Sequence, residues 1–309
     1  MARWKPSDSL DNLSTECQTE GMREQGIEID ERPDMKDPLL IAGFEGWGNA
    51  LNISDGMASF LIRKLDAKCF ARVDPDLFYR YDKSRPFVNI KKGVLEEISS
   101  PEGAFYAAPA RSCGKDIVIL KSEEPHLRWG DFLNILFSLC QDLGIRSIFT
   151  IGSMYDNVLH SDRIVSGIAS DETLFARMKQ KQVVPITYQG PSAIHSTIHW
   201  EAKKRGLQSL SLWCHCPYYL EGAVHFGLLA HLGNLLSFFG EFELDTQEME
   251  GEWKKLNRQI QSLIEGNPEL QNMISEIRRA KVRASWTGMK ESIEKGQKVI
   301  KLDDYINSR

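Results

Sequence analysis

Residues 121–129, which read KSEEPHLRW, bring several chemically capable side chains together. Glu123 or Glu124 could act as an acid or a base, and the planar guanidinium of Arg128 suits a carboxylate or a phosphate, provided that a pocket excludes water. The alternative is an internal Arg–Glu ion pair that ties this loop to the next helix, with Trp129 covering it. Both interpretations fit the residue types. The ion pair is the favoured one, and we keep these four residues as candidate ligand-binding residues.

The segments around this cluster indicate where it lies in the fold. Residues 116–121 form a short β-branched run typical of a buried strand, and residues 129–144 carry apolar residues at helical spacing. The cluster therefore lies at a β-to-α turn, and in open α/β sheets ligands usually bind at the carboxyl ends of strands. His160 and Arg163 follow the next predicted strand, 147–153, and would lie beside the cluster if the two strands are neighbours.

A glycine-rich segment, GFEGWGNALN at residues 43–52, follows a strand and begins a helix. Backbone N–H groups at Gly46, Gly48 and Asn49 could receive an anion at the positive end of that helix. The order of the glycines does not match a nucleotide-binding fingerprint, and no Gly-Lys-Ser/Thr follows. A tight turn is therefore the favoured interpretation, with an anion-binding turn as the alternative.

Two histidine-containing motifs have the residue types of metal sites but not the arrangement. His195 and His199 share one helix face, yet the HExxH order and a third ligand are missing. Cys214 and Cys216 should oppose His215, because alternate residues of a strand face opposite sides. We predict no metal site and no cofactor. No Gly-x-Ser-x-Gly elbow is found, and Ser192 is expected to cap the following helix.

Composition and charge exclude several function classes. The 309 residues are 42% hydrophobic and 26% charged, which is ordinary for a soluble α/β protein, and the net charge of −5 favours neither nucleic acid nor an anionic membrane. No apolar run is long enough to span a bilayer, and the amino end lacks a secretory signal, so a cytoplasmic location is expected. The six cysteines are then more consistent with buried thiols than with disulfides.

Strand and helix patterns alternate along most of the chain, which predicts a layered α/β domain with a mostly parallel sheet. The N-terminal residues have no sustained apolar period, and the residues after 242 change to charged helices separated by EGNPE. We divide the chain into a flexible arm at 1–37, an α/β core at 38–242, a helical hairpin at 243–283 and a polar tail at 284–309.

Several motifs occur in a fixed order: EEPHLRW (123–129), NVLHSDR (157–163), YQGPSAI (188–194) and SLWCHCPYY (211–219). With them, the chain resembles the bacterial branch of the proteasome assembly chaperone 2 family over residues 38–283, and GFEGWGNA (43–50) and YDKSRP (81–86) add to the match. Spaced motifs in order are more specific than any one of them. The resemblance implies a three-layer α/β/α sandwich of the phosphorylase/hydrolase-like kind.

The resemblance also implies a function. Eukaryotic and archaeal relatives assist proteasome assembly through a C-terminal hydrophobic-tyrosine-any-residue ending, whereas this chain ends in YINSR, with Tyr305 too far from the end. We therefore expect a cytoplasmic binding or assembly-factor-like protein, a homo-oligomer that contacts itself through the helical hairpin and possesses a protein partner. The alternative is a small-molecule enzyme, a hydrolase, phosphorylase or carboxylate–amine ligase, that uses Glu124, Arg128, His160 and Arg163.

Overall fold

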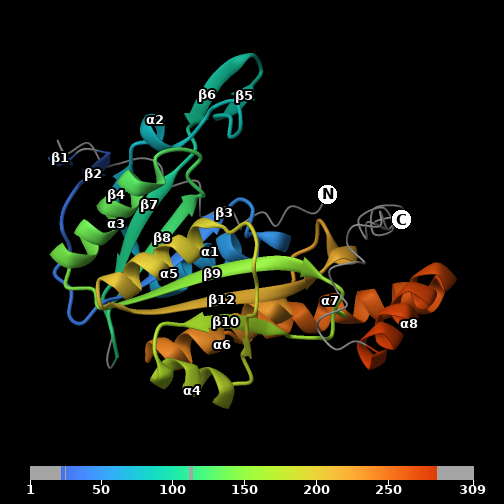
Figure 1. The fold of residues 1–309 in the computed structure, drawn as a ribbon. Helices are drawn as coiled ribbons and strands as arrows, with labels where there is room; N and C mark the ends of the chain where they lie inside the picture. The colour runs from blue at the N-terminus through green and yellow to red at the C-terminus, as the bar shows by residue number, and fades with distance from the viewer. Residues whose placement is uncertain (1–21, 25, 111–113, 284–309) are drawn as a thin grey trace.

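A ten-stranded sheet forms the middle layer of the molecule (Figure 1). The computed structural model describes residues 22–24, 26–110 and 114–283. In spatial order the strands are β1 (Met22–Glu24), β2 (Ile27–Ile29), β4 (Lys68–Val73), β7 (Gly103–Ala108), β8 (Ile117–Glu123), β3 (Leu39–Glu45), β9 (Ser147–Asp156), β12 (Gln208–Pro217), β10 (Val165–Ala169) and β11 (Val184–Pro185).

The central strands β8, β3, β9 and β12 run parallel to one another. Antiparallel pairings flank this centre, through β7, β4 and β2 on one side and β10 on the other. Parallel neighbours require crossover connections, which the helices between these strands provide. The predicted α/β sheet is therefore confirmed, with antiparallel strands extending both sides of its parallel centre.

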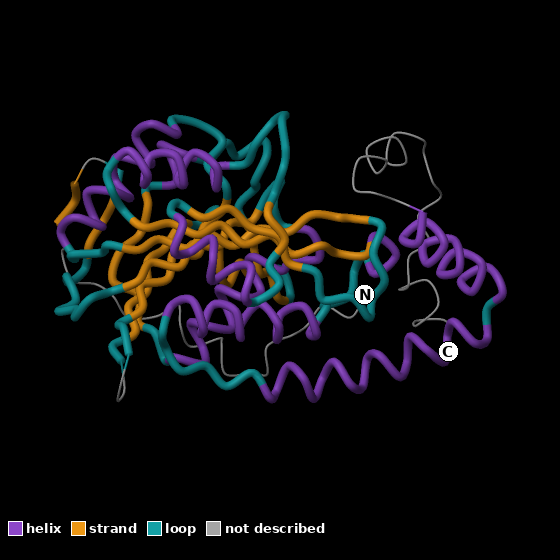
Figure 2. The backbone as a smooth tube through the Cα atoms, turned by 60° about the horizontal axis from the view of Figure 1, so that its bottom comes forward, coloured by secondary structure: helices purple, strands orange, loops and turns teal. Residues whose placement is uncertain are grey.

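Helices cover both faces of the sheet (Figures 1 and 2). One face packs against α1 (Ile53–Leu65), α4 (Glu172–Gln180), α6 (Phe226–Gly240) and α7 (Gln247–Gly266), and the other against α3 (Trp129–Asp142) and α5 (Ile194–Lys204). The short elements α2 (Pro75–Phe78), η1 (Ala50–Asn52) and η2 (Tyr218–Leu220) lie in connections. The expected three-layer α/β/α sandwich is confirmed. Within the described residues, no helix combines the length and hydrophobicity needed to cross a bilayer.

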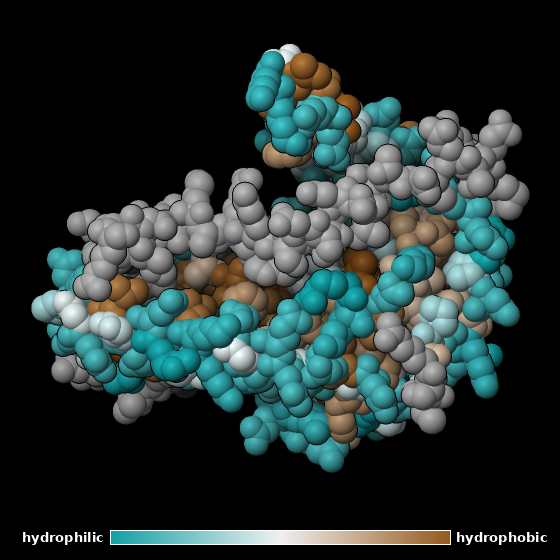
Figure 3. Space-filling model, turned by 180° about the vertical axis from the view of Figure 1, so that it is seen from behind, coloured by the Kyte–Doolittle hydropathy of each residue, from teal (hydrophilic) through white to brown (hydrophobic). Residues whose placement is uncertain are grey.

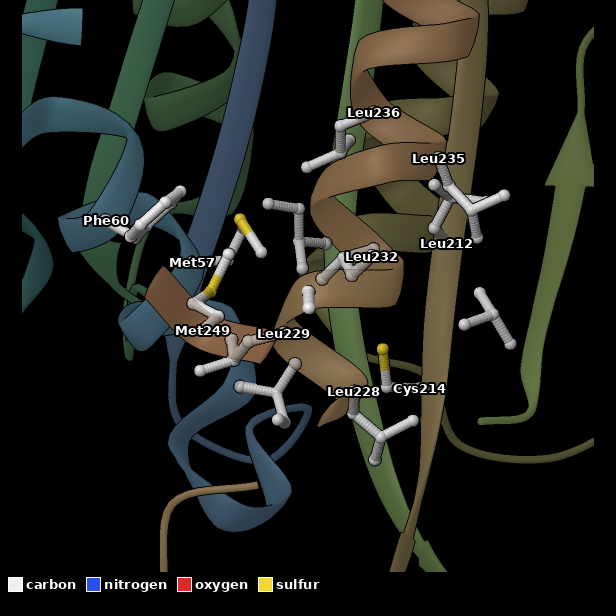
Figure 4. Close-up of a cluster of buried hydrophobic side chains, with 14 of the residues drawn as sticks. Met57, Phe60, Leu212, Cys214, Leu228, Leu229, Leu232, Leu235, Leu236 and Met249 are labelled. Atoms are coloured by element: carbon white, nitrogen blue, oxygen red, sulfur yellow. The ribbon is translucent and has the colours of Figure 1, made fainter. Parts of the chain in front are cut away.

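Strand β3 shows how the sequence builds two cores. Leu39 and Ile41 belong to the apolar cluster on the α6 face, whereas Leu40, Ala42 and Phe44 belong to the cluster on the α5 face. Strand side chains alternate between faces, so a strand with helices on both sides must be apolar at every position. On the α6 face, leucines of that helix gather with Leu212 and Cys214 of β12 (Figure 4).

The C-terminal helices form the hairpin that the sequence predicted. Helix α7 is followed by α8 (Pro268–Arg283), which lies at one end of the molecule (Figures 1 and 2). The Asn267 side chain accepts hydrogen bonds from the N–H groups of Glu269 and Leu270, at 2.9 and 3.3 Å, and so caps α8. Buried Ile274 and Ile277 join the core cluster of the α6 face.

The segment predicted as an N-terminal arm contributes to the sheet. Strand β2 pairs with β4, and its Ile27 and Ile29 side chains are buried among Phe70 and Val73. Two apolar positions separated by one residue are too short a pattern to indicate a strand, which is why the sequence did not show it. The polar tail predicted at 284–309, like residues 1–21, lies outside the described residues.

A second, two-stranded sheet projects from the body as a hairpin made of β5 (Phe87–Lys91) and β6 (Val94–Ser99) (Figure 1). Hydrophobic atoms are visible on its surface in the space-filling view (Figure 3). The hairpin is therefore set apart from both helical layers and from the main core.

Candidate functional site

Glu124 joins three segments of the chain at the carboxyl end of β8. Its Oε1 accepts a hydrogen bond from the Ile194 N–H at 2.7 Å, and its Oε2 accepts one from the Trp47 N–H at 3.4 Å. A carboxylate from another loop thus satisfies the amino end of α5, where we expected Ser192 to act. Gly46 packs against this side chain with φ +140°, and a Cβ there would lie 2.9 Å from the Glu124 Cβ.

The other predicted residues of this loop also have local partners. Arg128 pairs with Asp131 of its own helix, Nε to Oδ2 at 2.7 Å, rather than with the glutamates. The Trp129 indole donates to the Pro125 carbonyl oxygen at 2.5 Å. Glu123 lies beside Glu45 in the sheet, and burial, Asp55 and Glu123 together raise the pKa of the Glu45 carboxyl. The predicted Arg–Glu link is therefore replaced by an exposed Arg128–Asp131 pair.

His160 and Arg163 connect the loop after β9 to the helices of the α6 face. The Tyr219 hydroxyl accepts from the His160 backbone N–H at 2.7 Å and lies 2.8 Å from the ring Nδ1. Burial lowers the pKa of His160. The Arg163 guanidinium binds both carboxylate oxygens of Glu250 on α7, and this pairing lowers the pKa of Glu250. Both residues thus stabilise packing between the sheet and the C-terminal helices.

The order of the strands separates the two predicted clusters. Strand β3 lies between β8 and β9, so the clusters do not follow neighbouring strands. Among the described hydrogen bonds and ion pairs, none joins Glu124 or Arg128 to His160 or Arg163. A pocket shared by these four residues stays a prediction.

The predicted anion-binding turn already has an acceptor of its own. The Asn49 Oδ1 accepts from the Ser54 N–H at 2.9 Å and from the Asp55 N–H at 3.4 Å, in the first turn of α1. A Cβ on Gly48 would lie 3.1 Å from both the His195 and the Trp213 rings, so this glycine permits close packing. These contacts agree with a tight turn, and anion binding here stays a prediction.

The two histidines of α5 take separate structural partners. His195 Nε2 donates to the Ile151 carbonyl oxygen at 2.8 Å, and burial lowers the pKa of this ring to about 4. His199 Nδ1 lies 3.0 Å from the Ser209 hydroxyl. No group of three or more metal-ligating side chains was found among the described residues.

A large open cleft of about 1290 Å³ lies at the carboxyl ends of β9 and β12. The first turn of α5, the turn before α1, strand β10 and the segments around residues 185–192 and 221–224 complete its walls. Of the candidate ligand-binding and anion-binding residues predicted from the sequence, Gly46 and Asn49 line it. A concave site at strand carboxyl ends is the usual position for a ligand in this architecture.

Three residues in this cleft form a hydrogen-bonded series that the sequence did not reveal. The His215 Nδ1 lies 2.6 Å from Asp156 Oδ2, and its Nε2 lies 2.9 Å from Ser166 Oγ. An ionised carboxylate has no proton to give, so the proton of a neutral His215 ring lies on Nδ1, and in that tautomer Nε2 accepts from the serine hydroxyl. The Asn157 N–H holds the other carboxylate oxygen of Asp156 at 2.6 Å. Asp156, Ser166 and His215 all line the cleft.

The register of the sheet explains this convergence. His215 pairs with Met154 on β9 and Trp213 pairs with Ser166 on β10, so Asp156, His215 and Ser166 share one face. Cys214 and Cys216 belong to the core cluster on the opposite face, as the alternation predicted. Alternation thus indicated the face of His215, but its partners depend on register, for which the sequence offers no local signal.

The walls of the cleft are aromatic and carry acidic rather than basic groups. Trp47, Tyr155, Tyr188 and Trp213 line it, and Trp47 and Tyr188 are 66% and 55% exposed. The charged side chains among its described lining residues are Asp156 and Glu221, with no lysine or arginine. Such a cleft suits an uncharged or cationic ligand with a flat apolar group and disfavours phosphate.

Comparison with known proteins places this architecture in a family. The model of the PAC2 family matches residues 40–264, which is more than half of the chain. No curated protein matches the chain. Among solved structures, a PAC2 family protein from Streptomyces avermitilis is 24% identical, with 77% of this chain and 100% of that chain covered and a TM-score of 0.69.

Two further structures share the fold. The proteasome-assembly chaperone homologue of Mycobacterium tuberculosis is 21% identical, covers 76% of this chain and 99% of its own, and has a TM-score of 0.67. PbaB of Pyrococcus furiosus, an archaeal proteasome activator, is 20% identical over 78% of this chain and 99% of its own, with a TM-score of 0.61. The family resemblance inferred from the ordered motifs is confirmed, and the chain belongs to the PAC2 family.

Proposed function

We propose that this protein is a cytoplasmic, assembly-factor-like protein that acts by binding another protein. Its membership in the PAC2 family supports this role, as do structural neighbours described as a proteasome-assembly chaperone homologue and a proteasome activator. The observation that carries the proposal is the projecting β5–β6 hairpin.

One face of this hairpin is entirely aliphatic. Val88 pairs with Ile98 and Ile90 pairs with Leu95, so all four side chains lie on the same face. Their exposed fractions are 43%, 62%, 59% and 56%, respectively. We call these four residues the aliphatic face of the hairpin.

The opposite face of the hairpin carries polar and charged side chains besides the exposed Phe87 and Val94. Asn89 pairs with Glu97, and Lys91 forms an ion pair with Glu96, Nζ to Oε2 at 2.8 Å. An isolated two-stranded sheet is at best marginally stable in water, and contiguous exposed apolar residues mark interaction sites. The asymmetry of the hairpin therefore favours a partner protein that covers the aliphatic face with an apolar surface of its own.

Site-specific photo-cross-linking in the cells that make this protein tests the proposal. A photoreactive phenylalanine derivative replaces either Ile90, on the aliphatic face, or the adjacent Lys91, on the polar face. The side chains at both positions are exposed to solvent, so the two positions differ in the face of the hairpin to which they point and not in their exposure. We expect an adduct with a defined second protein at position 90, at least about tenfold stronger than at position 91 because neighbouring strand residues face opposite sides.

A second substitution tests whether the adduct at position 90 depends on the aliphatic face of the hairpin. Leu95→Ser on the same face should abolish the adduct formed from position 90, whereas Glu97→Ser on the other face should not. Equal adducts at positions 90 and 91, or none, would contradict the proposal. Adducts with the protein itself alone would show instead that the aliphatic face joins copies of this chain.

We also propose that the protein forms homo-oligomers through the C-terminal hairpin of α7 and α8. The outer side of this hairpin is charged, but Leu263 and Met273 are only partly buried against the core. Such positions can add a subunit contact while the fully buried residues Leu270 and Ile274 hold the hairpin to its own chain.

A further inference from the structure

We propose that Ser166 is an acyl-accepting nucleophile, activated by His215 and oriented by Asp156, and that the cleft hydrolyses uncharged carboxylic esters with aromatic or apolar groups. This activity is separate from protein binding by the β5–β6 hairpin. It rests on the directed series from Asp156 through His215 to Ser166 and on the position of all three in one cleft.

The geometry meets the requirements of a nucleophile and its base. In the neutral tautomer that Asp156 favours, the Ser166 hydroxyl donates to His215 Nε2, and the 2.9 Å between these two atoms is within the distance for proton transfer. Asp156 fixes both the tautomer and the orientation of the ring, and its own second oxygen is held by the Asn157 N–H. Each member comes from a different strand, β9, β12 or β10, so the sheet holds the three residues rigidly.

The reaction balances with water as the only other reactant. Ser166 Oγ attacks the ester carbonyl carbon while its proton passes to His215 Nε2. The carbon–oxygen bond to the alcohol then breaks, and the alcohol leaves with that proton. Water, deprotonated by Nε2, next attacks the acyl-serine, releases the carboxylic acid and restores the serine hydroxyl.

The walls of the cleft select the substrate class. The aromatic side chains Trp47, Tyr155, Tyr188 and Trp213 offer flat apolar surfaces, and the acidic groups Asp156 and Glu221 repel anions. The first turn of α5 forms one wall through Ala193 and Ser196.

A second serine–histidine pair in the same molecule supplies a matched control. Ser209 Oγ lies 3.0 Å from His199 Nδ1, and Ser209 is as buried as Ser166. Neither of these two residues lines the cleft, and no described carboxylate hydrogen bond orients His199. Ser209→Ala therefore removes a histidine-bonded serine hydroxyl without affecting the proposed reaction.

The experiment treats the full chain with an uncharged alkyl fluorophosphonate and locates the phosphonylated residue by peptide mass spectrometry. We expect the label on Ser166 of the wild type, its loss in Ser166→Ala, and retention in Ser209→Ala. His215→Gln should slow labelling by about 10²- to 10⁴-fold because it removes the general base. Hydrolysis of p-nitrophenyl butyrate should follow the same order and exceed that of the anionic p-nitrophenyl hydrogen succinate.

The site of the label in the wild type decides the question even if a variant fails to fold, and circular dichroism of each variant identifies such a failure. An unlabelled wild type, or a label at Ser209 or another residue, would overturn the proposal. The three residues would then serve only to connect strands β9, β10 and β12. Butyrate hydrolysis that persists in folded Ser166→Ala would overturn it as well.

Discussion

At the scale of single residues, Glu124 has a structural role. The sequence motif alone does not show this, because a glutamate at this position would also suit catalysis. Its carboxylate accepts from the Ile194 N–H at the start of α5, so Glu124→Ala leaves that group without its capping partner. We expect a loss of about 1–2 kcal/mol in the free energy of unfolding, as for the removal of an N-cap. Arg128→Ala, which removes an exposed pair with Asp131, should cost less than about 0.5 kcal/mol.

Urea unfolding of the two variants measures this difference. If Glu124→Ala unfolds at the same urea concentration as the wild type, the capping role is contradicted. Ligand binding that is lost from both variants without any loss of stability would revive the catalytic interpretation of the loop.

Two buried histidines should make the protein sensitive to acid. Burial lowers the pKa of both His195 and His225 from the ordinary value of 6.5 to about 4. The unfolded chain therefore binds protons between these values that the folded chain does not, so stability is fully present above pH 6.5 and falls as the pH drops toward 4. Each group contributes about 2–3 kcal/mol over this range.

The free energy of unfolding, measured at several pH values between 7.5 and 4.5, tests this expectation. His225→Asn keeps an acceptor for the Leu228 N–H but cannot be protonated, so its stability should depend less steeply on pH than that of the wild type. A wild-type stability that stays constant between pH 6.5 and 4.5 would contradict the burial argument.

At the scale of elements, local patterns identified the parts of the fold but not their order. The continuous apolar runs of β3 and β8 and the helical spacing in α3 predicted those elements, because strands and helices buried in a layered protein have distinct periodicities. That β3 lies between β8 and β9 depends on crossover connections, which no local pattern encodes. The expected proximity of His160 to Glu124 rested on that order.

The same distinction applies to the cleft. Alternation placed His215 opposite the cysteines of β12, which follows from the period of a strand. Its partners Asp156 and Ser166 lie 59 and 49 residues away and meet it only through the register of three strands. A one-residue shift in either pairing would move a partner to the other face of the sheet.

At the scale of the whole molecule, three surfaces have separate proposed roles. The β5–β6 hairpin offers an aliphatic face to a partner, the cleft binds a small ester, and the α7–α8 hairpin joins copies of the chain. The hairpins belong to different parts of the molecule (Figure 1), so a substitution in one should leave the contacts of the other intact.

Light scattering during size-exclusion chromatography tests the independence of the two protein-binding surfaces. The wild type should have a mass above that of one chain at concentrations of about 50 μM and approach it on dilution, because mass action governs association. Leu263→Ser together with Met273→Ser should shift the protein to monomer, whereas Ile90→Ser on the β5–β6 hairpin should leave the mass unchanged. A monomeric wild type at every concentration would contradict self-association, and a monomeric Ile90→Ser variant would assign it to the aliphatic face instead.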